Sequence, residues 1–353
     1  MTKQFTAIIL RNFKGGLHLS LGKEENYDRT QTMLHSDTLK SAIAVCALQL
    51  GLSEGGDELK KFMKSFCISS AYPMAKVGDS KCNQYFFPKP NVAQRLSVTD
   101  DDKKAKKVAY VEKSFFEKLL AKEQAITSEH IKGGKFAFAT KQDTATDFKL
   151  FDTQADQHVS IPRDGASDSK PYFMDKLYFD EGCGMFFLTD AQDDRLKELI
   201  ACIKLLADNG IGTDRTTGHG QFEFDEKKDV EPITLNLPDN ATHQLSLSLY
   251  CPEQTEISAQ LDKSYYDLIK RGGFIASPAD DNHLTIRKKT VYMFAEGSLF
   301  PNVADRKGKI VDLKPDDVGL QEKGQTALQH PIWRDGTGIF LPFAYQITND
   351  TNV

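Results

Sequence analysis

The apolar positions near the start of the chain predict a strand followed by a helix. Residues Phe5–Arg11 are mainly apolar and β-branched, which is typical of a strand. From Ser36 to Gly51 the apolar residues recur with helical spacing, so we expect a helix lying on a sheet, with Ser36 capping its start and Gly51 its end. The residues of this apolar stripe are Leu39, Ala42, Ile43, Cys46, Ala47 and Leu50.

A second helix is predicted directly before a loop rich in glycine. Its apolar residues lie on one face, Asp193 and Asp194 suit the positive end of the helix dipole, and Asn209-Gly210 supply a terminator. The loop is Gly210-Ile-Gly-Thr-Asp-Arg-Thr-Thr-Gly-His-Gly220, and Gln221–Glu226 then alternate with period two, as a strand does. The apolar residues of this helix are Leu196, Leu199, Ile200, Ile203 and Leu206.

The middle of the chain is less regular. Residues 78–107 contain Phe87-Pro-Lys-Pro90 and a run of mixed charges at Thr99–Lys107, so we expect a surface loop whose charges are solvated. Val111–Lys122 predict a short helix. Residues 133–168 are polar with only patchy alternation, which is typical of a functional insertion, and Tyr172–Leu188 return to strand-like sequence.

A domain boundary is predicted around Lys227–Asn240, where Pro232 and Pro238 stand in a charged stretch. This divides the chain into residues 1–230 and 231–353. Each part then begins with a strand and continues with a helix and further strands, which favours an α+β fold of two ferredoxin-like (RRM-like) modules. In the second part, the predicted strands are His243–Tyr250, Leu284–Phe294 and Ile339–Leu341, and the predicted helix is Leu261–Lys270.

Composition excludes several classes of protein. The 353 residues are 40% hydrophobic and 27% charged, which excludes disordered and collagen-like chains. The longest early apolar run, Phe5–Leu10, is too short for a signal sequence or a membrane span, so we expect a cytoplasmic protein without a membrane partner. The net charge of −5 argues against coating nucleic acid by bulk charge but leaves room for a local basic groove.

The six cysteines do not form a metal-binding pattern. Cys46, Cys67, Cys82, Cys183, Cys202 and Cys251 include no C-x-x-C pair and have no histidine at zinc spacing. We expect buried or free thiols, and neither a metal nor another cofactor.

The glycine loop does not fit the nucleotide-binding motifs. Arg215 stands where G-x-G-x-x-G needs its third glycine, and neither Gly210 nor Gly212 has a glycine five residues on. The loop also follows a predicted helix end, where the partial charge repels anions, whereas those motifs place the anion at a helix start.

Two interpretations of the loop remain open from its residues alone. Glycines at 210, 212, 218 and 220 let backbone N–H groups approach a ligand, and Arg215 adds a charged fork, so the loop suits a single RNA strand. The alternative is a plain turn that needs positive φ values.

The loop, followed by Phe222 and Phe224, resembles the G-rich loop of the RAMP superfamily of CRISPR proteins. Further segments resemble the family of the fourth subunit of type III-A (Csm) effector complexes over nearly the whole chain. These segments are His35-Ser-Asp-Thr-Leu39, Phe87-Pro-Lys-Pro90, Arg271-Gly-Gly-Phe274, Arg287–Phe294 with Glu296-Gly-Ser298, and His330–Gly336.

The resemblance implies a non-catalytic subunit of a ribonucleoprotein complex. It would bind the 5′ handle of the CRISPR RNA (crRNA), and its partners would be the large polymerase-like subunit and a RAMP backbone subunit. The loop departs from the family where Thr216-Thr217 and His219 replace a serine pair and an aromatic residue, which keeps the hydroxyl donors but not the stacking ring. Residues 133–168 would contain the thumb-like hairpin with which RAMP subunits reach the guide.

The RNA-binding residues expected from the loop, the first helix and the strand ends leave alternatives. His35 and Ser36 suit a helix cap that also touches RNA, a purely structural cap, or acid–base catalysis. Phe13, Phe274 and Trp333 are either stacking platforms or core aromatics. The expected RNA-binding set is Gly210, Gly212, Thr213, Arg215, Thr216, Thr217, Gly218, His219, Gly220, His35, Ser36, Arg11, Lys14, Arg271, Arg287 and Lys288.

Two rival functions stay open beside RNA binding without catalysis. One is a metal-independent endoribonuclease of the same superfamily that cuts precursor crRNA. The other is an assembly protein that contacts only other subunits.

Overall fold

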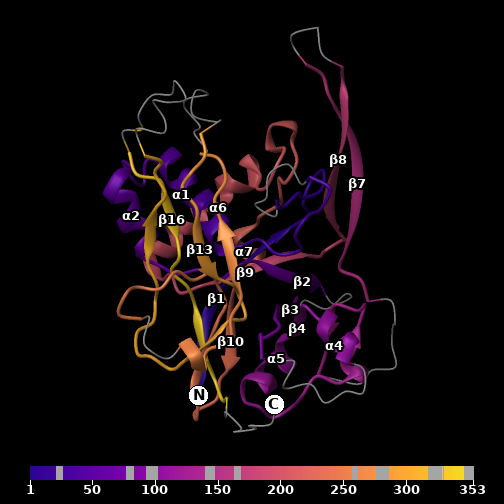
Figure 1. The fold of residues 1–353 in the computed structure, drawn as a ribbon, viewed down its shortest axis with the longest axis vertical. Coiled ribbons are helices and arrows are strands. Elements are labelled where there is room, and N and C mark those ends of the chain that lie inside the picture. Colours follow the sequence, from indigo (N-terminus) through magenta and orange to yellow (C-terminus); the bar gives the residue numbers. More distant parts are fainter. Residues whose placement is uncertain are drawn as a thin grey trace.

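A computed structural model describes ten stretches of the chain. They are residues 1–20, 27–76, 83–92, 102–139, 148–162, 168–256, 261–275, 286–316, 328 and 330–345. Cys82 and part of the charge run at 99–107 lie outside them. The fold is α+β with mixed sheets, as the sequence predicts (Figure 1).

The predicted opening strand lies inside the main sheet, next to its edge strand. β1 (Thr2–Arg11) pairs antiparallel with β10 (Val230–Asn236) on one side and with β9 (Gly184–Thr189) on the other. β9 pairs antiparallel with β2 (Tyr72–Lys76). Ala7–Leu10 of β1 are fully buried, so both faces of the sheet are covered at this point. The strand order of the whole sheet is β10-β1-β9-β2-β3-β4-β6-β5.

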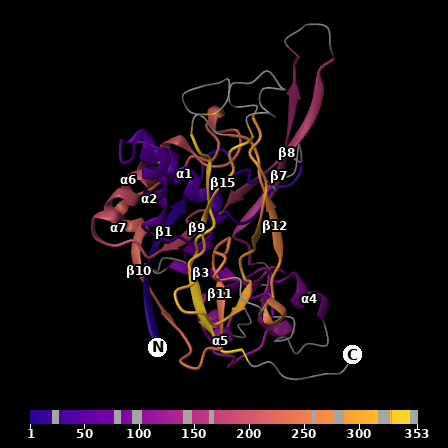
Figure 2. The same cartoon turned by 60° about the vertical axis from the view of Figure 1, so that its left-hand side comes forward.

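Two predicted helices pack together on one side of this sheet. α1 (Ser36–Gln49) and α6 (Asp193–Asn209) are gathered there with α2 (Gly56–Lys64) (Figure 2). Near their C-terminal ends, Asn209 Nδ2 donates to Gln49 Oε1 at 2.9 Å. α1 ends at Gln49 with Leu50 as its C-cap, and Gly51, the predicted terminator, follows with a φ of +68°.

The predicted cap of α1 is wrong. The N-cap residue is His35, whose side chain makes no capping hydrogen bond, and the Ser36 N–H donates to the Ser70 hydroxyl at 2.8 Å. The Ser36 hydroxyl instead accepts a hydrogen bond from the Leu249 N–H at 3.0 Å, so it is used by the C-terminal part of the chain.

The stretch predicted as a surface loop at 78–107 is partly regular. β3 (Asn83–Pro88) joins the sheet because Phe86 and Phe87 are buried, and the Phe87 ring stacks on Phe116 with centroids 4.7 Å apart. The predicted helix at Val111–Lys122 is confirmed as α5 (Lys113–Leu120). The other elements here are α4 (Asp102–Lys107), β4 (Tyr110–Glu112), η1 (Ser128–His130), β5 (Ile131–Lys132) and β6 (Phe136–Ala137).

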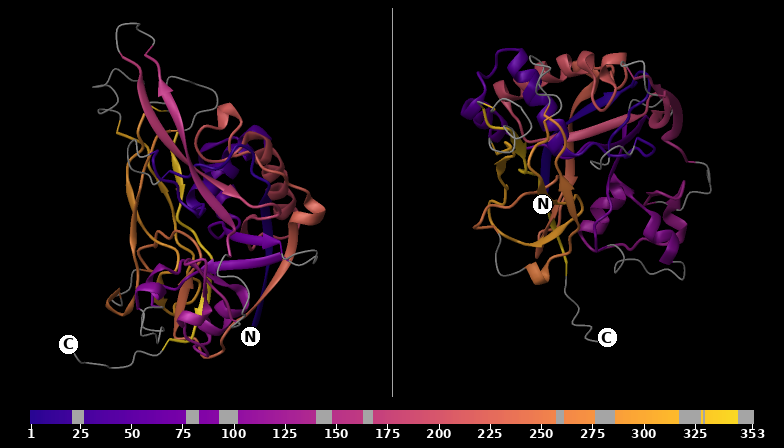
Figure 3. Two further views of the ribbon diagram at one scale, coloured as in Figure 1. Left: turned by 90° about the vertical axis from the view of Figure 1, so that its right-hand side faces the viewer. Right: turned by 45° about the horizontal axis from the view of Figure 1, so that its top comes forward.

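The second half of the predicted insertion belongs to a long hairpin. β7 (Phe151–Ser160) pairs with β8 (Lys170–Phe179) along its whole length, and the hairpin projects from the body of the protein (Figure 3). Its outer part exposes Val159, Ile161 and Phe173. The strand predicted within Tyr172–Leu188 is confirmed by β8 and β9.

Two local predictions around the boundary and beyond it are wrong. Residues 221–226 form no strand; Glu223 makes an isolated bridge to Arg11, and α7 (Glu226–Asp229) follows. Leu261–Lys270 is not a helix, because only η3 (Leu261–Lys263) is helical and Leu268–Arg271 form β12 against β13 (Val291–Phe294). β10, which lies in the predicted linker, belongs to the main sheet.

Short strands make up the C-terminal part. Among its described residues from 239 on, the regular elements are strands and η3, so the helical half of a ferredoxin-like module is not seen there. The predicted strands at His243–Tyr250, Leu284–Phe294 and Ile339–Leu341 correspond to β11 (His243–Ser246), β13 and β17 (Phe340–Phe343). The others are β14 (Leu299–Pro301), β15 (Ile310–Asp312) and β16 (Trp333–Asp335).

A buried carboxylate joins α1 to the C-terminal part. Asp37 is fully buried, and its Oδ2 lies 2.8 Å from Arg271 Nε and in contact with Arg334 Nη1. Burial alone would raise the pKa of Asp37, but the two guanidinium groups hold it well below its usual range. The carboxylate therefore stays ionised and fastens two distant segments to one helix.

A second buried pair supports the same contact between α1 and the C-terminal part, which we call the joint. His35 Nδ1 lies 2.8 Å from Glu296 Oε1, and the Ser70 hydroxyl donates to the same oxygen. Burial opposes ionisation of Glu296, but His35 and this hydroxyl together lower its pKa. The joint thus contains two ionised carboxylates, each with hydrogen-bond donors from another segment.

Removing the Asp37 charge should destabilise the fold strongly. Asp37→Asn leaves two buried guanidinium groups without a counter-charge, so we expect a loss of about 3–5 kcal/mol in the free energy of unfolding, measured with urea. The control is Asp194→Asn, which removes an exposed carboxylate at the start of α6 that pairs with Lys197 and should cost less than about 1 kcal/mol. Equal midpoints for the two variants would contradict this role of Asp37.

Candidate nucleic-acid interface

Three of the four loop glycines are packed against the protein itself. Gly210 ends α6 with a φ of +72°, and the Ile211 N–H donates to the Gly220 carbonyl at 3.0 Å. A Cβ at Gly212 would stand 2.5 Å from the His18 carbonyl, and one at Gly220 would clash with that of Ile211. These close approaches require glycine for intramolecular reasons, so they form a rigid base for the loop.

The tip of the loop, residues 214–218, is different. Asp214 and Gly218 are left-handed, with φ of +67° and +88°, and flank η2 (Arg215–Thr217), whose residues are all exposed. A Cβ at Gly218 would meet nothing within 4 Å. Within the described part of the chain, the side chains of Arg215 and Thr216 have no hydrogen-bond or ionic partner. The tip therefore offers a guanidinium, a hydroxyl and open backbone to a ligand.

His219 fastens the loop to its neighbours. Its Nδ1 donates to the Gly15 carbonyl, and its Nε2 lies 3.2 Å from Lys176 Nζ on β8. Lys176 is buried and also pairs with Asp156 at 3.0 Å, which lowers the pKa of Asp156. Both ring nitrogens of His219 are thus engaged with protein groups, which leaves the ring a positioning role. Lys176 was missed in the sequence because its partners are distant along the chain.

The two expected cations of the first strand and its turn behave differently. Lys14 is exposed beside the loop, where its backbone N–H donates to the Gln221 carbonyl at 2.7 Å and its carbonyl accepts from Gly220. Arg11 forms an ion pair with the buried Asp229 at 2.5 Å. The structure therefore groups Lys14 with the loop, whereas the charge of Arg11 is compensated inside the protein.

His35, Ser36 and Arg271 lie at the joint between the two parts of the chain. All three are buried. The loop starts beside Gln49, at the other end of α1, which is about 20 Å from His35 for a helix of this length. The structure does not bring these three residues to the loop.

The remaining expected cations, Arg287 and Lys288, lie near the Gly272-Gly273 turn, which follows Arg271. Lys288 lies next to Arg334 and Arg271, and burial together with these two charges lowers its pKa to about 8. Arg287 places its guanidinium 4.8 Å from the centroid of the Phe274 ring. These residues form a second cationic surface, separate from the loop in sequence.

The three aromatic candidates have different surroundings. Trp333 donates from Nε1 to the Gly56 carbonyl and packs under Lys60. Phe13 packs on Phe179 and Phe222 in the core. Phe274 is 53% exposed, so it is the one of the three that is available to an external ring.

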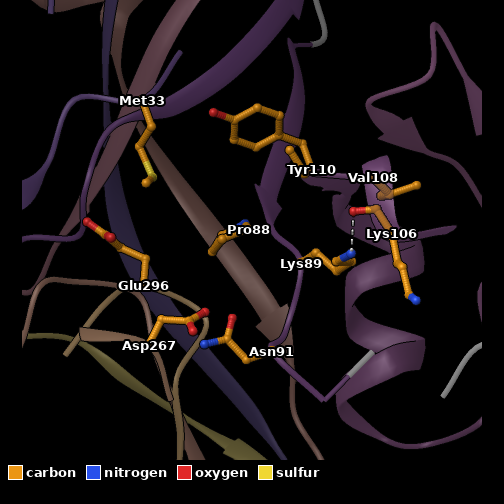
Figure 4. Close-up of a pocket in the computed structure, with 10 residues that line it drawn as sticks. Met33, Pro88, Lys89, Asn91, Lys106, Val108, Tyr110, Asp267 and Glu296 are labelled. Carbon is orange, nitrogen blue, oxygen red and sulfur yellow. Dashed lines mark hydrogen bonds between the residues drawn. The ribbon is translucent and has the colours of Figure 1, made fainter. Parts of the chain in front are cut away.

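A polar cavity of about 330 Å³ lies elsewhere, between β3, α4 and the C-terminal part (Figure 4). Lys89 donates to the Ala105 and Lys106 carbonyls, whereas Glu296 Oε2 and Asn91 Nδ2 have no hydrogen-bond partner among the described residues. The Asp267 carboxylate and Lys106 also line this cavity. Two carboxylates balance the two lysines, so the cavity has no excess positive charge to attract an RNA backbone.

The described residues contain neither a metal-binding cluster nor a membrane-spanning helix. No group of His, Cys, Asp and Glu in these stretches could hold a metal ion. No helix in the same stretches is long and apolar enough to cross a membrane. The five cysteines that the structure describes are buried, free thiols, as predicted.

The chain resembles known CRISPR proteins in sequence. Residues 239–343 match the family described as the CRISPR Csm4 C-terminal domain. A Csm4 protein of Mycobacterium tuberculosis is 26% identical over 269 residues, which cover 75% of this chain and 79% of that protein. A Csm4 protein of Methanocaldococcus jannaschii is 24% identical, with coverage of 91% and 93%.

Solved structures show the same fold. A chain in the crystal structure of a Csm3–Csm4 subcomplex of the type III-A interference complex has a TM-score of 0.62 and 21% identity, covering 96% of this chain and 99% of that one. A chain of a Csm1–Csm4 cassette in complex with cA4 has a TM-score of 0.56 and 18% identity, with coverage of 97% and 98%. The chain is thus similar in sequence to Csm4 proteins over most of its length, shares its fold with solved Csm4-containing structures, and matches the Csm4 C-terminal domain at residues 239–343.

Proposed function

We propose that this chain anchors the 5′ handle of crRNA in a type III-A effector complex and bridges the large polymerase-like subunit to the RAMP backbone subunits, without being an enzyme. The neighbouring structures combine Csm4 with Csm3 in one case and with Csm1 in another. One protein that meets both kinds of partner suits a bridging position.

The loop tip is the observation that carries RNA binding. Arg215 presents a planar fork suited to phosphate, and the exposed hydroxyl of Thr216 can bond to a phosphate or a 2′-hydroxyl group. The tip stands on a base fixed by Gly210, Gly212 and Gly220, so it needs little ordering when a ligand binds. Lys14 adds a further positive charge nearby.

The fold supports the same role. The elements β1-α1-β2-β9-α6-β10, with the antiparallel spatial order β10-β1-β9-β2, have the connectivity of a ferredoxin-like module. In this interpretation β3 to β8 are an insertion between the second and third strands of the module. The β7–β8 hairpin would then be the thumb that reaches along the guide.

The endoribonuclease alternative has little support at its candidate residues. Catalysis of RNA cleavage by 2′-hydroxyl attack needs an acid and a base that touch the substrate. His35 is 5% exposed and bonded to Glu296, and both nitrogens of His219 face protein groups. The shielding of His35 and the engaged nitrogens of His219 make both rings poor candidates for proton transfer to RNA.

Incubation with precursor crRNA in the presence of EDTA separates these functions. We expect no cleavage by the purified chain on a denaturing gel, with an active processing nuclease as the positive control. Cleavage that His35→Ala or His219→Ala abolishes, while Lys197→Ala does not, would show that the proposal is wrong.

Gly218 provides a test of the loop tip. Gly218→Val places a β-branched residue at a φ of +88°, whereas Gly218→Asn keeps a residue that tolerates this conformation. We expect the valine variant to lose or disorder the 5′ end of the guide in the assembled complex, measured by nuclease protection, and the asparagine variant to retain it. Unchanged protection in both variants, with normal assembly, would favour the assembly-only alternative.

Lys288 should make RNA binding depend on pH. Its lowered pKa of about 8 means that it loses its charge between pH 7 and 9, and a nearby phosphate favours the charged form. We expect affinity for a handle RNA to fall by up to about tenfold over this range, measured by fluorescence anisotropy. Lys288→Met should remove this dependence and Lys197→Met should keep it; the same pH dependence in both variants would contradict a contact at Lys288.

Protonation of Lys288 should also affect the free chain. Because the pKa in the fold lies below the usual lysine value near 10.4, the charged form is disfavoured by folding. Its contribution therefore destabilises the fold below about pH 8 and is relieved as the pH rises toward 10.4. Urea unfolding of Lys288→Met and Lys197→Met between pH 8 and 10.4 measures this effect on the free energy of unfolding without RNA.

A further inference from the structure

The outer face of the β12–β13 ribbon carries exposed aromatic rings. Tyr292 is 62% exposed, Phe274 and Leu268 are each 53% exposed, and Tyr266 is 39% exposed. Exposed apolar residues that cluster in this way mark interaction surfaces. Figure 2 shows β12 running along the surface of the C-terminal part.

The register of the ribbon places rings and cations side by side. Lys270 lies directly opposite Tyr292, and Phe274 lies opposite Arg287 at the next bridge of the ribbon. The Arg287 guanidinium covers the Phe274 ring. Lys270 is exposed, and its ammonium group has no partner within the described stretches. Tyr292 and Phe274 therefore each have a basic side chain next to the ring.

The two rings are on different strands. Tyr292 lies opposite Lys270, and Phe274 comes four residues after Lys270, beyond the Gly272-Gly273 turn. Bases stacked in a duplex are only about 3.4 Å apart. An RNA strand that reaches both rings would therefore present bases that are spread apart and unpaired.

The inner face holds the ribbon in place. Met293 is fully buried against Leu249, and Arg271 is bonded to Asp37 through two nitrogens. The outer rings consequently stand on a support that is tied to α1. A rigid support lowers the ordering cost of binding at the exposed face.

The charge of the ribbon distinguishes between RNA and a protein as its binding partner. The outer face of the ribbon and the adjoining bridge bear the exposed Lys270 and Arg287, against the exposed Asp267 directly before β12, on a chain whose net charge is −5. Lys288 lies further inward, beside Arg271 and Arg334. A local positive surface on an acidic protein attracts a polyanion, and rings between cations are typical of single-stranded nucleic acid binding. A hydrophobic protein partner would not require this concentration of positive charge.

We propose that the outer face of β12–β13 is a base-stacking site for unpaired RNA, with Tyr292 and Phe274 as platforms and Lys270 and Arg287 facing the backbone. This inference rests on the proposed function and adds a second contact surface that is distinct from the loop tip. The RNA it takes is a single strand in which the bases are splayed.

The test uses single-stranded RNA oligonucleotides and the complete chain. Tyr292→Leu keeps an apolar side chain but removes the ring, and we expect affinity by fluorescence anisotropy to weaken about tenfold. Tyr292→Phe is the matched control and should bind like the unchanged chain. Ultraviolet cross-linking, mapped by mass spectrometry, should place RNA on the peptide that contains Tyr292.

The results separate this inference from the proposed function. If the unchanged chain binds RNA, Tyr292→Leu binds equally well and no cross-link maps to β13, the stacking site is wrong while guide binding stands. If Tyr292→Leu instead weakens only the association with a partner subunit, the face is a protein interface and the inference is also overturned. If the unchanged chain and its assembled complex bind no guide, the proposed function itself fails.

Discussion

The ion pairs of Asp37 are the interaction on which the arrangement of the protein depends. One buried carboxylate at the start of α1 holds Arg271 from β12 and Arg334 from β16, residues separated from it by more than two hundred positions. Burying a charge is costly unless it is paired, so this geometry is favourable only when all three segments are in place. The position of the ribbon, and of the cations beside it, follows from this constraint.

The residues of the glycine loop have two roles, one structural and one proposed for RNA binding. Gly210, Gly212 and Gly220 allow the backbone to pass close to other backbone, and His219 ties the loop to Gly15 and Lys176. These contacts leave the 214–218 tip exposed on a fixed support. The glycine content that suggests an RNA cradle therefore has a largely structural cause, and the proposed contact with RNA is confined to a few residues.

The sequence predicts the elements with long, regular patterns well. β1, α1 and α6 occur where the apolar spacing places them, because a strong period leaves one way to bury the apolar face. Leu261–Lys270 fails as a helix because its apolar residues are used in pairing with β13, a partner about 25 residues away. The apolar pattern within one segment does not show which distant strand that segment pairs with.

The candidate site is predicted only in part for the same reason. Lys14, which the sequence places only near a strand end, lies beside the loop with its exposed tip. The burial of His35, Ser36 and Arg271 depends on contacts with Glu296, Leu249 and Asp37, which no short motif shows. The sequence does not single out Tyr292, because which face of a strand is exposed depends on which residues pack against its opposite face.

The most direct test of the account is the salt dependence of handle RNA binding with and without the Arg215 charge. If the loop tip contacts the RNA backbone, Arg215→Ala should reduce the slope of log K against log salt by about 0.7, the value for one single-strand phosphate contact. Lys197→Ala, which removes an exposed charge on α6, should leave the slope unchanged. An unchanged slope for Arg215→Ala would contradict the claim that this tip holds the guide.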